Sequence, residues 1–225
     1  MRSRLEIEEE LASKVGSLLE EEINQNGSAS LLVSGGSTPK GFFSSLSIKD
    51  IQWEKVSISL VDERFLPDGC SDQNGTMVKK YLLRNNARKA QFYPMVLNPT
   101  DLNANLEEFK SSIKELSKPF TVVVLGMGED GHTASFFPDS LELKEVMSSN
   151  NQERVMTVST DSSPYPRITF TYQELINAKH LFLHFYGEKK EEILNKAKVE
   201  KGFLPYPIQM FVNDPNKSIE IFSNP

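Results

Sequence analysis

Cysteine is almost absent from this chain of 225 residues, in which Cys70 is the only one. A single cysteine excludes an internal disulfide, so the fold must be stabilised by its apolar core. Cys70 lies in the segment 67–71 (PDGCS), whose proline and glycine are typical of a surface loop. We therefore expect a free thiol that takes no part in catalysis.

Histidine is also scarce, and long apolar runs are missing. The three histidines and one cysteine show no spacing typical of a zinc site, so we expect no metal ion. No apolar run approaches the roughly 20 residues that span a bilayer, so no membrane contact is expected. The N-terminus is charged from Arg2 onward and lacks the apolar core of a signal peptide, which favours a cytoplasmic protein.

The balance of charge is mildly acidic, with 25 Lys and Arg residues against 31 Asp and Glu residues. This excess of negative charge disfavours nucleic acid as a partner. It does not exclude a small anionic ligand, because a local group of Arg and Lys can bind phosphate within an acidic protein. We expect a small-molecule partner, and the composition leaves monomer and homodimer open.

Apolar segments of strand length alternate with helical stripes along the chain. Ser3 and Glu6 suit a capping box, and Asp101 suits an N-cap. The alternation predicts the α/β class, with a Rossmann-like, mainly parallel central sheet flanked by helices and built as one domain of residues 1–225. Strands are predicted at 29–33, 56–61, 120–125 and 180–185, more weakly at 210–212 and 219–222, and helices at 3–26, from about 39, and at 74–83, 102–116 and 188–197.

Three polar motifs directly follow three of the predicted strands: SGGSTP at 34–39, DER at 62–64 and GMGEDGHTAS at 126–135. Ligands of parallel sheets bind beyond the carboxyl ends of the strands, so these motifs can form one site. The first motif precedes a predicted helix and has the composition of an anion site, although an ordinary strand-to-helix turn can have the same composition. Its N–H groups and hydroxyls belong to Gly35, Gly36, Ser37 and Thr38.

The third motif contains a literal GxGxxG, the pattern of dinucleotide-binding folds. That fold requires a long helix directly afterwards and then a strand that ends in an acidic residue about 20 positions on. Pro138 ends any helix early, and the segment 146–152 has the composition of a loop. Nucleotide binding is therefore disfavoured.

Asp130 and His132 in the same motif suit acid–base chemistry. A carboxylate beside an imidazole can orient the ring and raise its basicity, and a histidine can act as a base near neutral pH. His180 and His184 alternate within a predicted strand, and we assign them no role.

Arg64, Arg167 and Lys189 are candidates for binding an anion. Arg64 ends the DER motif, Arg167 lies in PYPRIT at 164–169, and Lys189 lies in GEKK at 187–190, where a helix is predicted to begin. Taken singly, Arg167 and Lys189 are better explained as exposed charges.

Taken together, the motifs resemble those of the 6-phosphogluconolactonase family. SGGSTP, DER, LGMGEDGHTASFFP at 125–138, PRIT at 166–169 and GEKK occur in that family's order, and the resemblance extends over about residues 5–222. Glucosamine-6-phosphate deaminases of the same superfamily have a similar pattern but carry an acidic residue five positions after the histidine. Phe137 occupies that position here, which favours the lactonase over the deaminase.

The resemblance implies a role for each motif residue. His132 matches the family's general base, Asp130 would orient it, and Arg64 would stabilise developing negative charge. Asp62 would line the pocket. The 6-phosphate would be bound by Gly36, Ser37 and Thr38 with Gly35 of the same loop, together with Arg167 and Lys189. The chain departs from the family pattern at Gln73, where serine is usual, and the match is loose from residue 205 onward.

The activity implied is hydrolysis of 6-phospho-D-glucono-1,5-lactone to 6-phosphogluconate, in the oxidative pentose phosphate pathway, with no cofactor. Two alternatives stay open at this point. One is an enzyme similar to glucosamine-6-phosphate deaminase or isomerase, and the other is a sugar-phosphate binding protein without catalysis.

Overall fold

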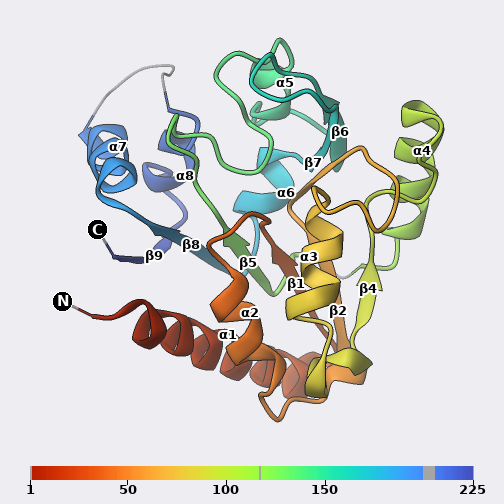
Figure 1. The fold of residues 1–225 in the computed structure, drawn as a ribbon, viewed down its shortest axis with the longest axis vertical. Coiled ribbons are helices and arrows are strands. Elements are labelled where there is room, and N and C mark those ends of the chain that lie inside the picture. The colour runs from red at the N-terminus through yellow and green to blue at the C-terminus, as the bar shows by residue number, and fades with distance from the viewer. Residues whose placement is uncertain (1, 117, 200–205, 225) are drawn as a thin grey trace.

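The computed structural model describes residues 2–116, 118–199 and 206–224. Its centre is a six-stranded sheet in the order β4-β2-β1-β5-β8-β9, in which every neighbouring pair is parallel (Figure 1). The predicted α/β class and mainly parallel sheet are therefore confirmed. The strands are β1 (Ala29–Val33), β2 (Val56–Leu60), β4 (Gln91–Tyr93), β5 (Val122–Leu125), β8 (His180–Tyr186) and β9 (Glu220–Asn224).

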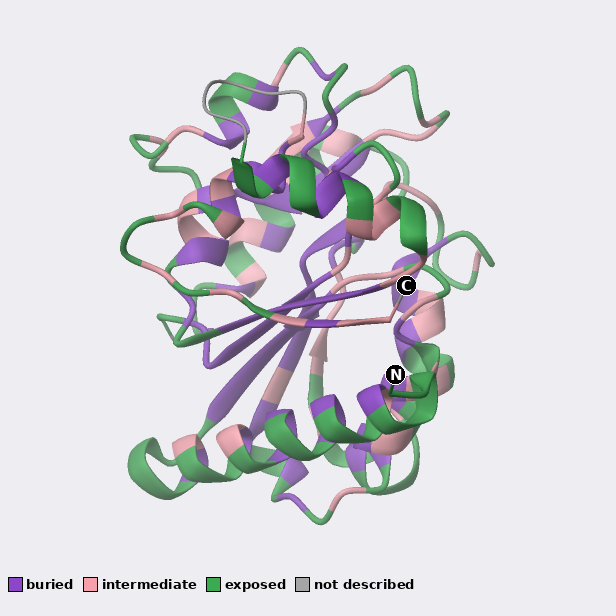
Figure 2. Cartoon of the chain, turned by 90° about the vertical axis from the view of Figure 1, so that its left-hand side faces the viewer, coloured by how far each residue is buried: buried purple, intermediate pink, exposed green. Residues whose placement is uncertain are grey.

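Helices cover both faces of this sheet, as Figure 2 shows with the buried strands between them. All residues of β1 and β5 are buried, which explains their continuous apolar sequences. The long helix α1 (Arg4–Asn26) lies on one side, against α2 (Lys40–Ser47) and β1. Its buried side chains repeat about every four residues, as an amphipathic helix requires, at Ile7, Leu11, Val15, Leu19 and Ile23.

The predicted helix caps are present. Ser3 and Glu6 form both hydrogen bonds of the capping box at the start of α1, and Asp101 accepts two backbone N–H groups at the start of α4. The predicted helices at 74–83 and 188–197 are also confirmed, with slightly different ends. The helices beyond α2 are α3 (Asn74–Tyr81), α4 (Leu102–Ser112), α5 (Leu143–Val146), α6 (Tyr172–Ile176), α7 (Glu188–Val199) and α8 (Gln209–Val212).

The prediction of a strand at 210–212 was wrong, because these residues belong to α8. The Asn213 N–H donates to the Gln209 carbonyl oxygen at 3.1 Å, which closes one helical turn. A short apolar run shows no periodicity that separates a strand from a buried helical turn. The weak strand expected at 219–222 is confirmed as β9, paired with β8.

A second, antiparallel sheet of three strands was not predicted. It consists of β3 (Asp62–Arg64), β7 (Arg167–Phe170) and β6 (Val155–Val158), in the order β3-β7-β6. The DER motif is thus itself a strand. Apolar alternation could not indicate it, because all three of its residues are charged. In this register Arg64 stands opposite Arg167, so two distant motifs become neighbours.

The strand order reverses between β1 and β5. From β1 the chain adds β2 and then β4 on one side, and it returns to place β5 on the other side. The loops after β1 and β5 therefore leave the sheet in opposite directions and open a crevice at its carboxyl edge. None of the described helices is long and apolar enough to cross a bilayer.

Candidate active site

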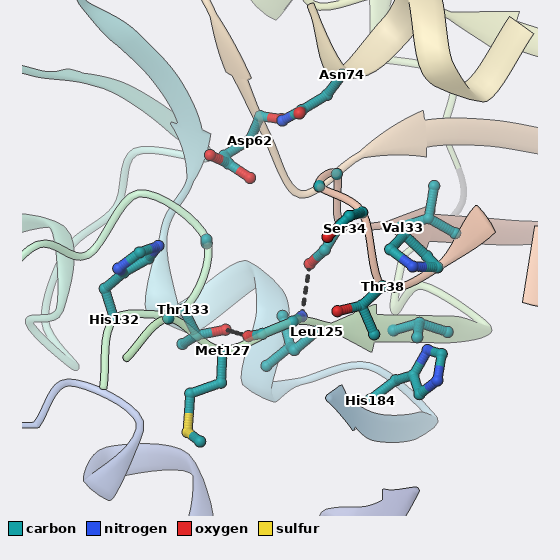
Figure 3. A pocket seen from close by; sticks show the side chains of 18 of the residues that line it. Val33, Ser34, Thr38, Asp62, Asn74, Leu125, Met127, His132, Thr133 and His184 are labelled. Atoms are coloured by element: carbon teal, nitrogen blue, oxygen red, sulfur yellow. Dashed lines mark hydrogen bonds between the residues drawn. The ribbon is translucent and has the colours of Figure 1, made fainter. Parts of the chain in front are cut away.

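A cavity of about 660 Å³ lies at this crevice. Its wall takes residues from the segments after β1 and β5, from β3 and β7, and from the start of α7. Figure 3 shows Thr38, Asp62 and His132 approaching it from three separate segments. All ten predicted site residues line this cavity: Gly35, Gly36, Ser37, Thr38, Asp62, Arg64, Asp130, His132, Arg167 and Lys189.

The loop 34–39 presents unpaired backbone donors to the cavity. Among the described residues, the N–H groups of Gly36, Ser37 and Thr38 donate to no acceptor, and α2 begins directly after them. The Ser34 hydroxyl oxygen accepts the Gly126 N–H at 2.8 Å, so this loop is tied to the segment after β5 (Figure 3). Free N–H groups before a helix N-terminus form a suitable anion site.

Gly35 is required in this loop by a close approach to α3. A Cβ at position 35 would lie 1.9 Å from Asn74 Oδ1, and Asn74 is itself held because its Nδ2 donates to the Asp62 carbonyl oxygen at 3.0 Å. Glycine at this position therefore lets the loop pack against the first residue of α3.

Gly35→Ala is expected to displace the loop 34–39 and to raise KM for a phosphorylated substrate by about tenfold or more. Steady-state kinetics of the variant tests this expectation. Gly16→Ala is the matched control, since a Cβ there meets only ordinary contacts, the nearest at 3.4 Å to Ile51 Cδ1. A KM for Gly35→Ala equal to that of the control would contradict the assignment.

Asp130 and His132 form the hydrogen-bonded pair that the sequence predicted. The carboxylate oxygen Oδ1 of Asp130 lies 2.5 Å from His132 Nδ1 and also accepts the His132 backbone N–H at 3.1 Å. Gly128 permits this turn, because a Cβ there would lie 2.3 Å from the imidazole ring. With Nδ1 engaged by the carboxylate, Nε2 is the nitrogen left to act on a substrate or water.

The charge of Asp130 is maintained by this pairing. Burial alone would raise the pKa of the Asp130 carboxyl, but the hydrogen bond from His132 and its positive charge outweigh burial and lower it. Asp130 is therefore an anion at neutral pH, able to orient the imidazole and to stabilise its protonated form.

Phe137 separates the histidine from a guanidinium group. Its ring centroid lies 4.5 Å from that of His132, with the planes tilted by 40°, and the Arg167 guanidinium carbon lies 5.3 Å from the same ring centroid. Phe137 is almost fully buried, so the aromatic ring fixes the spacing of the two groups.

Arg167 is held in place by two polar side chains, the buried Asp62 and the partly exposed Ser163. Its Nη1 lies 3.6 Å from Asp62 Oδ2, and its Nη2 donates to the Ser163 hydroxyl at 3.0 Å. Asp62 Oδ2 in turn accepts the Ser135 hydroxyl at 2.6 Å. Burial lowers the pKa of Arg167, and the carboxylate of Asp62 opposes that shift. Arg64 is less constrained: among the described residues its guanidinium donates one hydrogen bond, from Nη1 to the Asp72 carbonyl oxygen at 2.6 Å.

Two lysines at the start of α7 line the cavity in different ways. Lys189 is 66% exposed in its side chain, and its Nζ lies 2.5 Å from Glu129 Oε2. Lys190 is half-buried, and it forms no ion pair among the described residues. Burial lowers the pKa of Lys190, as expected for an ammonium group withdrawn from water. Lys190 was not predicted as a site residue, because the GEKK motif alone does not show which of its two lysines is half-buried at the cavity.

His184 also lines the cavity wall, although no role was predicted for it. It is buried on β8, its Nε2 lies 3.0 Å from the Tyr186 hydroxyl, and its Nδ1 has no partner among the described residues. Burial lowers the pKa of His184 to about 4. It is therefore a neutral ring at physiological pH and not a second base.

Among the described residues, no group of three or more His, Cys, Asp or Glu side chains is placed to hold a metal ion. The cavity instead gathers cations, backbone donors and one carboxylate–imidazole pair. This combination is chemically suited to a phosphorylated ligand with a general base beside it.

The chain is similar to known proteins over nearly its whole length. Residues 2–219 match the family described as glucosamine-6-phosphate isomerases/6-phosphogluconolactonase. A 6-phosphogluconolactonase of Rhizobium meliloti is 39% identical over 217 residues, which cover 96% of this chain and 94% of that protein. The crystal structure of a 6-phosphogluconolactonase from Shewanella baltica superimposes with a TM-score of 0.93 at 34% identity, over 99% of this chain and 95% of that one.

The fold is shared more widely than the sequence. A monomeric glucosamine-6-phosphate deaminase superimposes with a TM-score of 0.78 at only 16% identity, over 99% of this chain and 95% of that chain. Similarity at this level shows a common architecture and leaves the choice of reaction to the residues of the site.

Proposed function

The chain belongs to the family of glucosamine-6-phosphate isomerases and 6-phosphogluconolactonases, and on this basis we propose that it hydrolyses 6-phospho-D-glucono-1,5-lactone to 6-phosphogluconate. The observation that carries the proposal is the Asp130–His132 pair in a cavity that also offers anion-binding groups. A cavity of about 660 Å³ is of the size that binds small molecules.

The phosphate of the substrate would be bound at the loop 34–39. The backbone N–H groups of Gly36, Ser37 and Thr38 would donate hydrogen bonds to the phosphate just before α2. Lys190 would add a positive charge. Lys189 at the rim and Arg167 in the wall complete the positive surroundings. Binding at the phosphate fixes the lactone carbonyl near His132, which supplies orientation.

In the proposed reaction, His132 Nε2 removes a proton from a water molecule while that water attacks C1 of the lactone. The carbonyl π electrons move to oxygen, and Arg64 stabilises the resulting oxyanion. When the oxyanion re-forms the carbonyl, the bond between C1 and the ring oxygen breaks. The ring oxygen takes the proton from His132 and becomes the C5 hydroxyl. Water is thus added across one acyl–oxygen bond, with no change of oxidation state.

This reaction belongs to the oxidative pentose phosphate pathway, and a cytoplasmic location is part of the proposal. We also propose that residues 1–225 act as one unit, since the cavity draws residues from the loop after β1 to the start of α7. The proposed reaction sets no requirement for a particular oligomeric state, and the proposal includes both monomer and homodimer.

Phe137 argues against the deaminase reaction. Its apolar ring contacts both His132 and Arg167, and it stands five positions after the histidine, where the resemblance implies an acidic residue in the deaminases. The lactone is an activated ester, so its hydrolysis needs only a base, an oriented water and stabilisation of the oxyanion.

The lactone can be generated from glucose 6-phosphate by its dehydrogenase, and its loss followed with and without this protein. We expect loss faster than the spontaneous rate and no ammonia from glucosamine 6-phosphate. Ammonia release without faster lactone loss would replace the proposal by a deaminase. Tight binding of 6-phosphogluconate with neither reaction would replace it by a binding protein.

Lys190→Ala is expected to raise KM for the lactone by about tenfold or more, with kcat nearly unchanged, because a half-buried charge at the phosphate is removed. Lys189→Ala serves as the matched variant and should raise KM less, since Lys189 is exposed and paired with Glu129. Steady-state kinetics of both variants checks the assignment. An unchanged KM in Lys190→Ala would contradict it.

A further inference from the structure

Glu63 is a buried carboxylate at the edge of the site that the mechanism does not use. It stands between Asp62 and Arg64 on β3, and both of these neighbours line the cavity, whereas Glu63 is not part of the described wall. Its exposed fraction is only 1%. A buried carboxylate needs several hydrogen-bond donors to offset its desolvation.

Three backbone N–H groups supply these donors. Glu63 Oε1 accepts the N–H of Arg64 at 2.7 Å and that of Asn74 at 2.8 Å. Glu63 Oε2 accepts the N–H of Gly75 at 2.7 Å. One carboxylate therefore binds β3 and the first two residues of α3 at the same time.

This contact closes the loop 65–73 that connects β3 to α3. Gln73, the residue before α3, makes no capping hydrogen bond with its side chain, so Glu63 takes the place of a local N-cap. Within the loop, the Asp72 carbonyl oxygen accepts a hydrogen bond from Arg64 Nη1. The position of the Arg64 guanidinium thus depends on the loop that Glu63 closes.

We propose that Glu63 is a positioning residue for the lactonase reaction, which sets the Arg64 guanidinium in the cavity by holding β3 against the N-terminus of α3. This inference rests on the proposed function. Glu63 touches no substrate in this arrangement and acts only through Arg64 and the loop 65–73.

The ionised form of Glu63 is the form that fits its partners. A carboxylate accepts hydrogen bonds on both oxygens, whereas a protonated carboxyl carries one O–H that must donate. All three partners of Glu63 are donors, so the O–H of a protonated Glu63 would find no acceptor among them and would weaken the N–H hydrogen bonds to the oxygen that carries it.

Protonation falls within the working range of pH. Burial raises the pKa of Glu63 to about 7, against the lowering effect of its three N–H partners, and the negative charge of Asp62 raises it further. The guanidinium group of Arg167 is the other charged group that interacts with it among the described residues. Because the pKa of Glu63 is higher in the folded protein than in the unfolded chain, the neutral acid stabilises the folded state at pH values below the ordinary pKa of glutamate. This stabilisation is lost as the pH rises towards 7, and the ionised form adds none. The ionised carboxylate is thus retained at a cost to folding, consistent with a role in activity.

Glu63→Gln tests the proposal, because glutamine has the same shape but presents one acceptor and one donor, like the protonated acid. We expect kcat at pH 8 to fall by about tenfold or more, since misplacement of a charged group by about 1 Å is costly, with KM for the lactone changed by less than about threefold. In the wild-type protein kcat depends on His132 as the base, and protonation of Glu63, whose pKa is raised to about 7, should lower kcat about tenfold further, so log kcat should fall by more than one per pH unit just below that pKa. In Glu63→Gln the slope should be one.

Glu174→Gln is the matched control. Glu174 is a mostly buried carboxylate that accepts hydrogen bonds from Arg154 and Lys118, and it lies outside the described cavity wall. We expect this variant to lose thermal stability and to keep its kcat and its pH profile. A Glu63→Gln variant with the kcat and acid slope of the wild-type protein would overturn this inference and leave the proposed function standing.

The remaining outcomes are also decisive. If Glu63→Gln does not fold, the wild-type profile still tests the proposal, and an acid limb with a slope of one overturns it. If the wild-type protein does not hydrolyse the lactone, the proposed function fails and this inference fails with it.

Discussion

Replacing His132 with alanine is expected to lower kcat by about 10²-fold or more, with KM within a few-fold of the wild-type value. The His132 imidazole lies in the cavity with its Nδ1 hydrogen-bonded to the Asp130 carboxylate. Its Nε2 is therefore left to act on water as the base. Its loss removes proton transfer in the transition state but leaves the phosphate-binding groups in place. Steady-state kinetics with lactone generated during the assay measures the effect after subtraction of the spontaneous rate.

Two further variants separate the chemical role of His132 from a structural role. Asp130→Asn should also lower kcat, since an amide at this position can favour the wrong tautomer of the imidazole. His180→Ala, on the exposed end of β8, should leave kcat unchanged. The melting temperature of His132→Ala should stay near that of the wild-type protein, because the histidine side chain is 31% exposed. Near-normal turnover in His132→Ala would exclude it as the base.

Arg64→Ala is the second variant with a large expected effect, a loss of about 10²- to 10³-fold in kcat. Arg64 and Arg167 stand opposite each other in the small sheet, but Arg167 is held by Asp62 and Ser163. Within the part of the chain that the structure describes, the Arg64 guanidinium donates to the Asp72 carbonyl oxygen alone, so further N–H donors remain for an oxyanion.

Arg64→Lys is the informative companion to Arg64→Ala. It keeps the positive charge but loses the planar set of donors, and its kcat should lie between those of the wild-type protein and the alanine variant. If Arg64→Ala instead raises KM and keeps kcat, Arg64 binds the phosphate and another group stabilises the oxyanion.

The central sheet could be predicted from the sequence because its strands are buried on both faces. Val122–Leu125 and Ala29–Val33 are continuous apolar runs, and their position beside each other follows from the rules of parallel sheets. The motifs that follow these strands could therefore be expected at one edge. The Asp130–His132 contact could also be predicted, since only one residue separates the two in the chain.

The small sheet could not be predicted from the sequence. The contacts that it brings together in the site could therefore not be predicted either. Asp62–Arg64 pairs with residues more than 100 positions later, and none of its three side chains is apolar. The role of Glu63 depends on contacts with Asn74 and Gly75 that no local pattern indicates. Likewise, only the orientation of α7 distinguishes Lys190 in the cavity from Lys189 at the rim.

The central claim is that water, activated by His132, attacks the lactone carbonyl directly. The cavity also holds the carboxylates of Asp62 and Asp130, either of which could in principle attack the carbonyl itself. In a single turnover with enzyme in excess, in water labelled with the heavy oxygen isotope, mass spectrometry shows whether water attacks the substrate carbonyl carbon or the carbonyl carbon of an aspartyl anhydride. We predict that the first 6-phosphogluconate formed carries one heavy oxygen in its carboxylate and that the protein carries none. Unlabelled product together with a labelled aspartate in the protein would contradict the account.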